Sequence, residues 1–137
     1  MSAAIREKLG IAYALNAVSA SGVDTGSFVF YVGTTRDKLD IARDELFKLI
    51  DSIKADGITD KELKDAKTQL AGLQRIALQD NGSIALTASL DELYGLGYDY
   101  FTKYESRLNS VTAEDVKKAA NKYLRPDSYV LVLLKGK

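Results

Sequence analysis

The stretch from Arg6 to Tyr13, R-E-K-L-G-I-A-Y, holds the residues of this chain with the clearest chemical use. Arg6 carries a guanidinium fork that can grip carbonyl groups or a carboxylate. Gly10 lets the backbone bend, so that Tyr13 follows on a strand with its hydroxyl available as a hydrogen-bond donor. In the alternative interpretation Arg6 is a surface charge and Tyr13 packs in the core. Composition alone favours this alternative, because charged and aromatic residues are common near the starts of strands.

Two further stretches are aromatic. Residues 28–31, F-V-F-Y, faintly resemble the end of the consensus of RNA-binding sheets, but residues 24–27 do not fit it and contain no basic residue. We predict a hydrophobic strand there. Residues 94–104 are rich in tyrosine, and such a cluster can stack a ligand. At helix boundaries it more often fastens one helix to its neighbour, so we predict a packing role.

Several classes of chemistry are missing from the residue types. The sequence contains no histidine and no cysteine, which excludes disulfides, thiolate nucleophiles, histidine bases and the usual zinc ligands. No calcium-loop spacing, P-loop or G-x-G-x-x-G motif is found either. We therefore predict that the chain has no catalytic residue, no metal site and no cofactor of its own. Any part that it plays in catalysis must be as a piece of something larger.

Length and charge narrow the class further. The 137 residues, 46% of them hydrophobic, predict a single domain over 1–137 with one sizeable core. Nineteen basic residues balance nineteen acidic ones, and a net charge of zero argues against a nucleic-acid surface and against a polybasic membrane anchor. No stretch approaches the ~20 apolar residues of a membrane span. The pattern is typical of a soluble protein, and cytoplasm and periplasm both stay open.

Periodicity gives the elements that would position Arg6 and Tyr13. Period-two alternation over 11–18 and the aromatic run 28–32 predict an antiparallel hairpin. Period 3.6 spacing then predicts helices, and a last apolar run predicts a central strand. The predicted helices are 36–55, 60–79 (opened by the capping box Thr59–Glu62), 83–94, 99–109 and 112–125, and the predicted last strand is 128–134. The fold class is α+β, an antiparallel sheet covered by a layer of helices, in outline β-β-α-α-α-α-β.

A series of short motifs runs through the whole chain in one order. After the Arg6–Tyr13 stretch come Y-V-G-T at 31–34, G-I-T-D-K-E-L at 57–63, E-L-Y-G-L at 92–96, V-T-A-E-D-V at 111–116 and A-A-N-K-Y-L-R-P-D at 119–127. The series resembles the pitrilysin/insulinase family of zinc metallopeptidases, which carry an inverted zinc motif. That family includes the mitochondrial processing peptidase and its bacterial relatives. The part resembled is the C-terminal portion of a domain that binds no zinc.

The resemblance implies roles for two residues. In the family the H-x-x-E-H zinc motif lies in another domain, and its glutamate polarises the zinc-bound water. The domain resembled here contributes an arginine and a tyrosine across a closed chamber, at positions that match Arg6 and Tyr13. By this analogy Tyr13 hydrogen-bonds the scissile carbonyl or its oxyanion, and Arg6 holds a nearby substrate carbonyl. The implied partners are a peptide substrate and a zinc-bearing domain or subunit of the same family.

The sequence also departs from the family pattern. It has no H-x-x-E-H, and a family domain would supply a strand, a helix and further sheet before the arginine. We therefore expect the back part of one domain, a non-catalytic, substrate-positioning portion that is inactive by itself. An incomplete sheet leaves an open edge, which predicts a homodimer when the chain is isolated. The alternative is a structural or protein-interaction module of the same fold without a proteolytic role.

Overall fold

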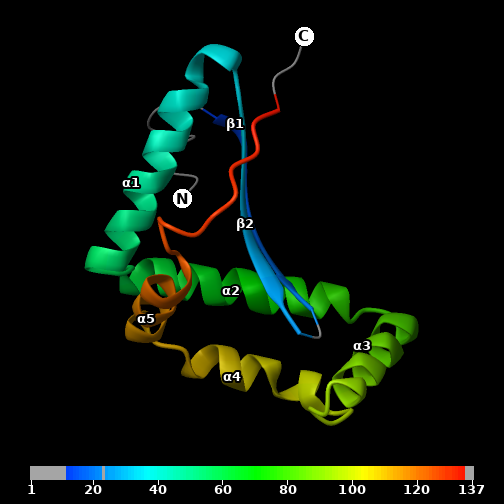
Figure 1. The fold of residues 1–137 in the computed structure, drawn as a ribbon. Helices are drawn as coiled ribbons and strands as arrows, with labels where there is room; N and C mark the ends of the chain where they lie inside the picture. Colours follow the sequence, from blue (N-terminus) through cyan, green and yellow to red (C-terminus); the bar gives the residue numbers. More distant parts are fainter. Residues whose placement is uncertain (1–11, 23, 135–137) are drawn as a thin grey trace. The chain divides into compact units, whose positions relative to one another are not determined.

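The computed structural model describes residues 12–22 and 24–134, which form two compact units (Figure 1). The first unit contains the described residues up to Asp56 and from Ala119 onward, and the second contains Gly57–Lys118. The first unit holds β1 (Ala12–Ser21), β2 (Gly26–Thr34), the short 3-10 helix η2 (Arg36–Lys38) and α1 (Leu39–Asp56). The second holds α2 (Asp60–Ala77), α3 (Asn81–Leu93), the 3-10 helix η3 (Tyr100–Lys103) and α4 (Tyr104–Ser110), and α5 (Ala113–Tyr123) passes from the second unit into the first.

The predicted hairpin is confirmed. β1 and β2 pair in antiparallel fashion from Ser21 opposite Gly26 to Ala12 opposite Thr34. Leu15 lies opposite Val32, and these two side chains therefore share one face of the pleated hairpin. A register shift between Ala12 and Ala14 interrupts the pairing near the start of β1. This irregularity determines the position of Tyr13.

Helix α1 packs on the Leu15 and Val32 face of the hairpin. Ala42 of α1 is only 2% exposed and contacts both of these residues, together with Leu46 and Leu49 of its own helix. A small side chain at position 42 allows this close approach. The predicted apolar stripe of the helix is thus confirmed, although its first residues, 36–38, form a 3-10 turn instead of α-helix.

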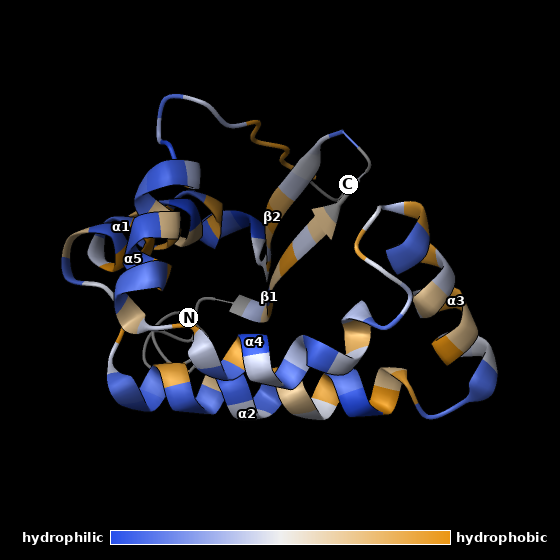
Figure 2. Ribbon diagram, turned by 90° about the horizontal axis from the view of Figure 1, so that it is seen from below, coloured by the Kyte–Doolittle hydropathy of each residue, from blue (hydrophilic) through white to orange (hydrophobic). Residues whose placement is uncertain are grey.

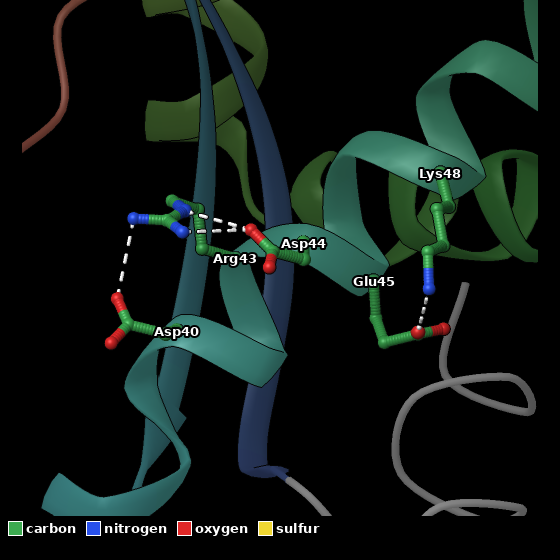
Figure 3. A network of polar contacts seen from close by, with 5 residues as sticks. All are labelled: Asp40, Arg43, Asp44, Glu45 and Lys48. Atoms are coloured by element: carbon green, nitrogen blue, oxygen red, sulfur yellow. Dashed lines mark hydrogen bonds and ion pairs between the residues drawn. The ribbon is translucent and has the colours of Figure 1, made fainter.

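The opposite face of α1 is polar. Figure 3 shows Arg43 between Asp40 and Asp44, with nitrogen-to-oxygen distances of 3.2 and 2.9 Å, and Lys48 on Glu45 at 2.8 Å. Arg43 and Glu45 are partly exposed and the other three side chains are largely exposed, so such pairs contribute little to stability. They mark a solvated helix face and hold no ligand-binding arrangement.

The second unit confirms the predicted start of α2, whereas α3 begins at Asn81 instead of 83 and a 3-10 helix precedes α4. The Thr59 hydroxyl accepts a hydrogen bond from the backbone N–H of Glu62, and the Glu62 carboxylate accepts one from the N–H of Thr59, which completes the capping box. Asp80 caps α3 in the same way by accepting from the N–H of Ser83. Arg75 of α2 pairs with Glu105 of α4 at 2.7 Å, and the Lys67 ammonium donates to the carbonyl of Asn109 at 2.8 Å. These contacts join α2 to α4.

The predicted third strand at 128–134 is wrong. Among the described residues the sheet has two strands, and 128–134 lies outside any ladder. Apolar, β-branched residues make a strand only where they pair with the edge of a neighbouring strand, and in the described residues β1 and β2 pair only with each other. The segment instead contacts α1 through Tyr129, whose ring lies 5.2 Å from that of Phe47. Val130 and Leu134 are 89% and 88% exposed, so the segment is not central.

The outline of the fold is otherwise as expected. The α+β class is confirmed, with five α-helices in the described residues, one for each predicted range and one more than the outline order gives. Ala42 and Ala120 are the fully buried apolar side chains in the described ranges, and the single domain over 1–137 with one sizeable core stays a prediction. Apolar residues also lie on exposed faces of the hairpin, of α2 and of α3 (Figure 2). None of the described helices has the length and apolar character needed to cross a membrane.

Candidate functional site

Tyr13 occupies a β-bulge at the start of β1. Ala12 pairs with Thr34 and Ala14 pairs with Gly33. Thr34 and Gly33 are adjacent in β2, whereas Ala12 and Ala14 have one residue between them. This extra residue of β1 is Tyr13. A bulge leaves its extra residue outside the ladder and turns the side chain away from the regular alternation. The tyrosine is therefore presented by the backbone irregularity itself, next to a regular and well-paired hairpin.

The Tyr13 side chain is open to solvent. It is 68% exposed, and among the described residues its hydroxyl has no hydrogen-bond partner. The ring lies over Gly33, which is itself buried. The interpretation of Tyr13 as a core residue is thus wrong, because most of its side chain is exposed. Arg6, the second predicted site residue, lies outside the described residues, and its predicted role stays a prediction.

The two faces of the hairpin carry different residues and have different neighbours. α1 covers the face that carries Leu15 and Val32. Gly33 follows Val32 in β2, so it belongs to the opposite face, and Tyr13 lies over it there. Helix α1 thus packs on one face of the hairpin, and Tyr13 lies on the opposite face.

The aromatic stretch 94–104 has a local structural role. The guanidinium of Arg107 lies 3.5 Å from the centroid of the Tyr100 ring and donates to the carbonyl of the same residue at 2.9 Å. This cation–π contact and hydrogen bond fasten η3 to α4. The predicted packing role fits this contact better than a ligand-stacking role does.

The displaced pKa values belong to helix starts and surface pairs. Hydrogen bonds from the backbone and hydroxyl of Thr59 hold the pKa of Glu62 below its ordinary value. The hydroxyl and backbone of Ser83 lower the pKa of Asp80, and those of Thr112 lower the pKa of Asp115. All three carboxylates cap helices, where anions are favoured. They explain why the helices begin where they do, and all three belong to the second compact unit.

Metal-ligating side chains are not gathered in the described part of the chain. No group of three or more Asp or Glu residues is placed there to hold an ion, and the sequence supplies no histidine or cysteine. The chemical capacity of the site is that of a tyrosine hydroxyl on a hairpin, which can donate a hydrogen bond to an acceptor such as a carbonyl oxygen.

Two structural features of the candidate site were not found from the sequence, namely the bulge and the glycine beneath the ring. The usable signal was a glycine inside an aromatic, β-branched strand, since such a glycine often marks a bulge or a close approach. The motif Y-V-G-T at 31–34 contained it, but sequence alone does not say which side chain comes close.

Comparisons with known proteins agree with this arrangement. Residues 1–70 match the family model of the peptidase M16 inactive domain. An uncharacterized zinc protease of Streptomyces coelicolor is 33% identical over 139 residues, which covers 97% of this chain and 29% of that protein. An uncharacterized zinc protease of Bacillus subtilis is 28% identical over 130 residues, covering 95% and 32%. The chain thus spans about a third of the length of these relatives.

Solved structures show the same fold. The inactive peptidase domain of a candidate zinc protease from Bordetella parapertussis superposes with a TM-score of 0.73 at 17% identity, over 92% of this chain and 70% of that one. The periplasmic protease PqqL of Escherichia coli superposes with a TM-score of 0.62 at 19% identity, over 90% and 14%. At such identities the likeness concerns the fold alone. The family match covers just over half of the chain and confirms the resemblance drawn from its motifs, and the chain therefore belongs to the M16 peptidase family as a domain of the inactive type.

Proposed function

We propose that this chain is the non-catalytic, substrate-positioning portion of a zinc metallopeptidase and works beside a zinc-bearing domain or subunit of the same family. The observation that carries the proposal is the exposed Tyr13, held on a bulge at a position that matches the family's tyrosine. The relatives named as zinc proteases support the setting, since they extend well beyond the part that this chain matches.

Tyr13 acts on the carbonyl of the peptide bond to be cleaved. As the carbonyl carbon is attacked, its oxygen gains negative charge, and a preorganised hydroxyl donor stabilises that charge more in the transition state than in the bound substrate. Arg6 holds a neighbouring substrate carbonyl by its guanidinium fork and so fixes the register of the peptide. Neither residue takes or gives a proton in this scheme.

Zinc chemistry belongs elsewhere in the assembly. Peptidase zinc sites are built from histidine and carboxylate ligands, and this chain supplies no histidine and, in its described ranges, no clustered carboxylates. The residues present do not fit a zinc ion, and no step here passes through one.

A first prediction follows for the purified chain. It should bind no stoichiometric zinc and hydrolyse no peptide, because it lacks the ligands and the activated water that hydrolysis needs. Elemental analysis after dialysis, with a zinc-bearing relative treated in parallel as the control, checks this. One tightly held zinc per chain would contradict the assignment of this chain as zinc-free.

The alternative function is that of a structural module of the same fold, and it predicts a different role for Tyr13. In such a module the hydroxyl would be dispensable, although the ring would still cover Gly33. The experiment that separates the two functions is the replacement of Tyr13 by phenylalanine in the assembled peptidase, meaning this chain together with its zinc-bearing domain or subunit.

We further propose that the isolated chain forms a two-fold homodimer. In the described residues each strand of the hairpin has one unpaired edge. Phe28 and Val29 are half exposed, and Val130 of the C-terminal segment is 89% exposed. Open edges with apolar side chains are templates for pairing with another chain. The seam is either β2 around residues 28–32 or the segment 129–133.

The dimer gives a second prediction. Light scattering over a concentration series should show a mass that rises from one chain to two. Val29→Lys and Val130→Lys place a charge on each candidate seam, and the variant that moves the transition to higher concentration identifies the true one. A monomer at every concentration, or a dimer indifferent to both variants, would contradict this proposal.

A further inference from the structure

Gly33 is the buried residue on which the ring of Tyr13 rests. A Cβ added to Gly33 would lie 2.7 Å from Cε2 and 3.0 Å from Cζ of Tyr13, and 3.1 Å from the Cβ of Ala14. Carbon atoms in ordinary van der Waals contact are at least 3.4 Å apart. The space above Gly33 is therefore filled by the tyrosine, and a side chain at position 33 and the present ring position exclude each other.

Space, and not backbone conformation, accounts for glycine at position 33. The described glycines with positive φ are Gly57, Gly95 and Gly97, and Gly33 is not among them. Gly33 has the backbone conformation of a strand, which any amino acid can adopt. An alanine would thus fit the backbone of β2 and would conflict only with what lies over it.

The bulge explains why the conflict involves Tyr13. Two residues of β1, Tyr13 and Ala14, face the single residue Gly33 of β2. Both side chains approach the position of the missing Cβ, so both lie on the same side of the hairpin as Gly33. A bulge produces this two-against-one arrangement. Regular pairing would have sent Tyr13 and Ala14 to opposite faces.

The ring atoms nearest to Gly33 are those that determine the position of the Tyr13 hydroxyl. Cζ of tyrosine carries the oxygen, and Cε2 is its neighbour in the ring. We infer that Gly33 is a positioning residue for Tyr13: its lack of a side chain seats the hydroxyl-bearing end of the ring where the substrate carbonyl is to be met. This inference rests on the proposed function of Tyr13 and adds the residue that determines where its donor lies.

The size of the effect follows from the geometry. Moving the ring from 2.7 Å to an ordinary contact of 3.4 Å displaces it by about 0.7 Å, the difference of these two distances. Donors to an oxyanion act over a narrow range of distances, and a misplacement of about 1 Å can cost on the order of a hundredfold in rate. Because the ring is mostly exposed, it can swing outward without unfolding the hairpin.

The test is a double-mutant cycle in the assembled peptidase. Gly33→Ala alone should lower kcat about tenfold with KM little changed, the pattern expected when only a transition-state interaction is lost. In a Tyr13→Phe background the same change should cost almost nothing more, because the hydroxyl it would misplace is already gone. Gly72→Ala is the matched control, since no atom lies within 4 Å of that Cβ position. It should leave kcat unchanged.

Two results would overturn the inference. One is full activity of Gly33→Ala, and the other is an equal loss in both backgrounds, which a merely structural role would give. A readout independent of activity uses isotope-labelled glycine in the same assembly. The Hα resonances of Gly33 should be shifted upfield by the Tyr13 ring and should lose that shift in Tyr13→Leu.

The resonance measurement also separates the two hypotheses. If Tyr13→Phe is fully active while the upfield shift is present, the proposed function fails and the seating of the ring stands as geometry. If the shift is absent or survives Tyr13→Leu, the seating itself is wrong, whatever Tyr13 does in catalysis.

Discussion

Replacing Tyr13 by phenylalanine should lower kcat/KM of the assembled peptidase about tenfold or more, the scale of losing one transition-state hydrogen bond. The loss should fall on kcat, because the hydroxyl meets the carbonyl oxygen most strongly once charge has developed there. Steady-state kinetics on a peptide substrate, with kcat and KM resolved, measures it. The fold should hardly change, since the ring stays on Gly33 and only an exposed hydroxyl is removed.

The control for this variant is Tyr98→Phe. Tyr98 is 70% exposed, against 68% for Tyr13, but belongs to the other compact unit. It removes the same atom from an equally open tyrosine and should leave kcat/KM unchanged. A Tyr13→Phe enzyme as active as this control would favour the structural module over the substrate-positioning function.

Arg6→Ala belongs to the same prediction and should also reduce kcat/KM about tenfold or more, through loss of the contact that holds a substrate carbonyl. Arg6→Lys distinguishes the fork from the charge. Lysine keeps the positive charge but lacks the planar fork of donors that is proposed to hold the substrate carbonyl, so it should restore little of the activity. Full recovery by lysine would show that charge alone is needed.

The hairpin and the helices could be predicted from the sequence, because both depend on local information. The alternation over 11–18 and the spacing of apolar residues in α1 are present in any short window. The capping box at Thr59 and Glu62 is likewise a local motif, and the structure shows both of its hydrogen bonds. Elements of this kind are determined by neighbours three or four residues away.

The features that were missed depend on partners distant in the chain. Residues 128–134 form a strand only if another strand pairs with them, and the sequence of the segment does not show whether such a partner is present. A hydrophobic fraction of 46% does not tell which apolar side chains find a partner, and many large apolar side chains among the described residues are exposed. The bulge at Tyr13 depends on how two strands pair. Within a short window of sequence, the glycine at position 33 is the one residue that points to it.

A last prediction concerns the contact that holds the hairpin to α1. Ala42→Asp should lower the free energy of unfolding of the chain by about 3 kcal/mol or more, since it places a charge without a partner in a site that is 2% exposed. The side chains around it, Leu15, Val32 and Leu46 among them, offer the new carboxylate no hydrogen bond. Denaturant unfolding followed by circular dichroism measures the change.

Ala85→Asp, the same substitution at an exposed position within α3, is the matched control and should cost well under 1 kcal/mol. The loss in Ala42→Asp should also shrink as the pH falls. Burial raises the pKa of the introduced carboxyl above its value in the unfolded chain. The penalty from its charge is therefore full above the raised pKa, falls as the pH drops between the two pKa values, and is absent below the unfolded one. A penalty equal to the control, or one independent of pH, would show that α1 does not bury this position against the hairpin. Because α1 fixes the face opposite Tyr13, the variant should lose the seating of the tyrosine along with its stability.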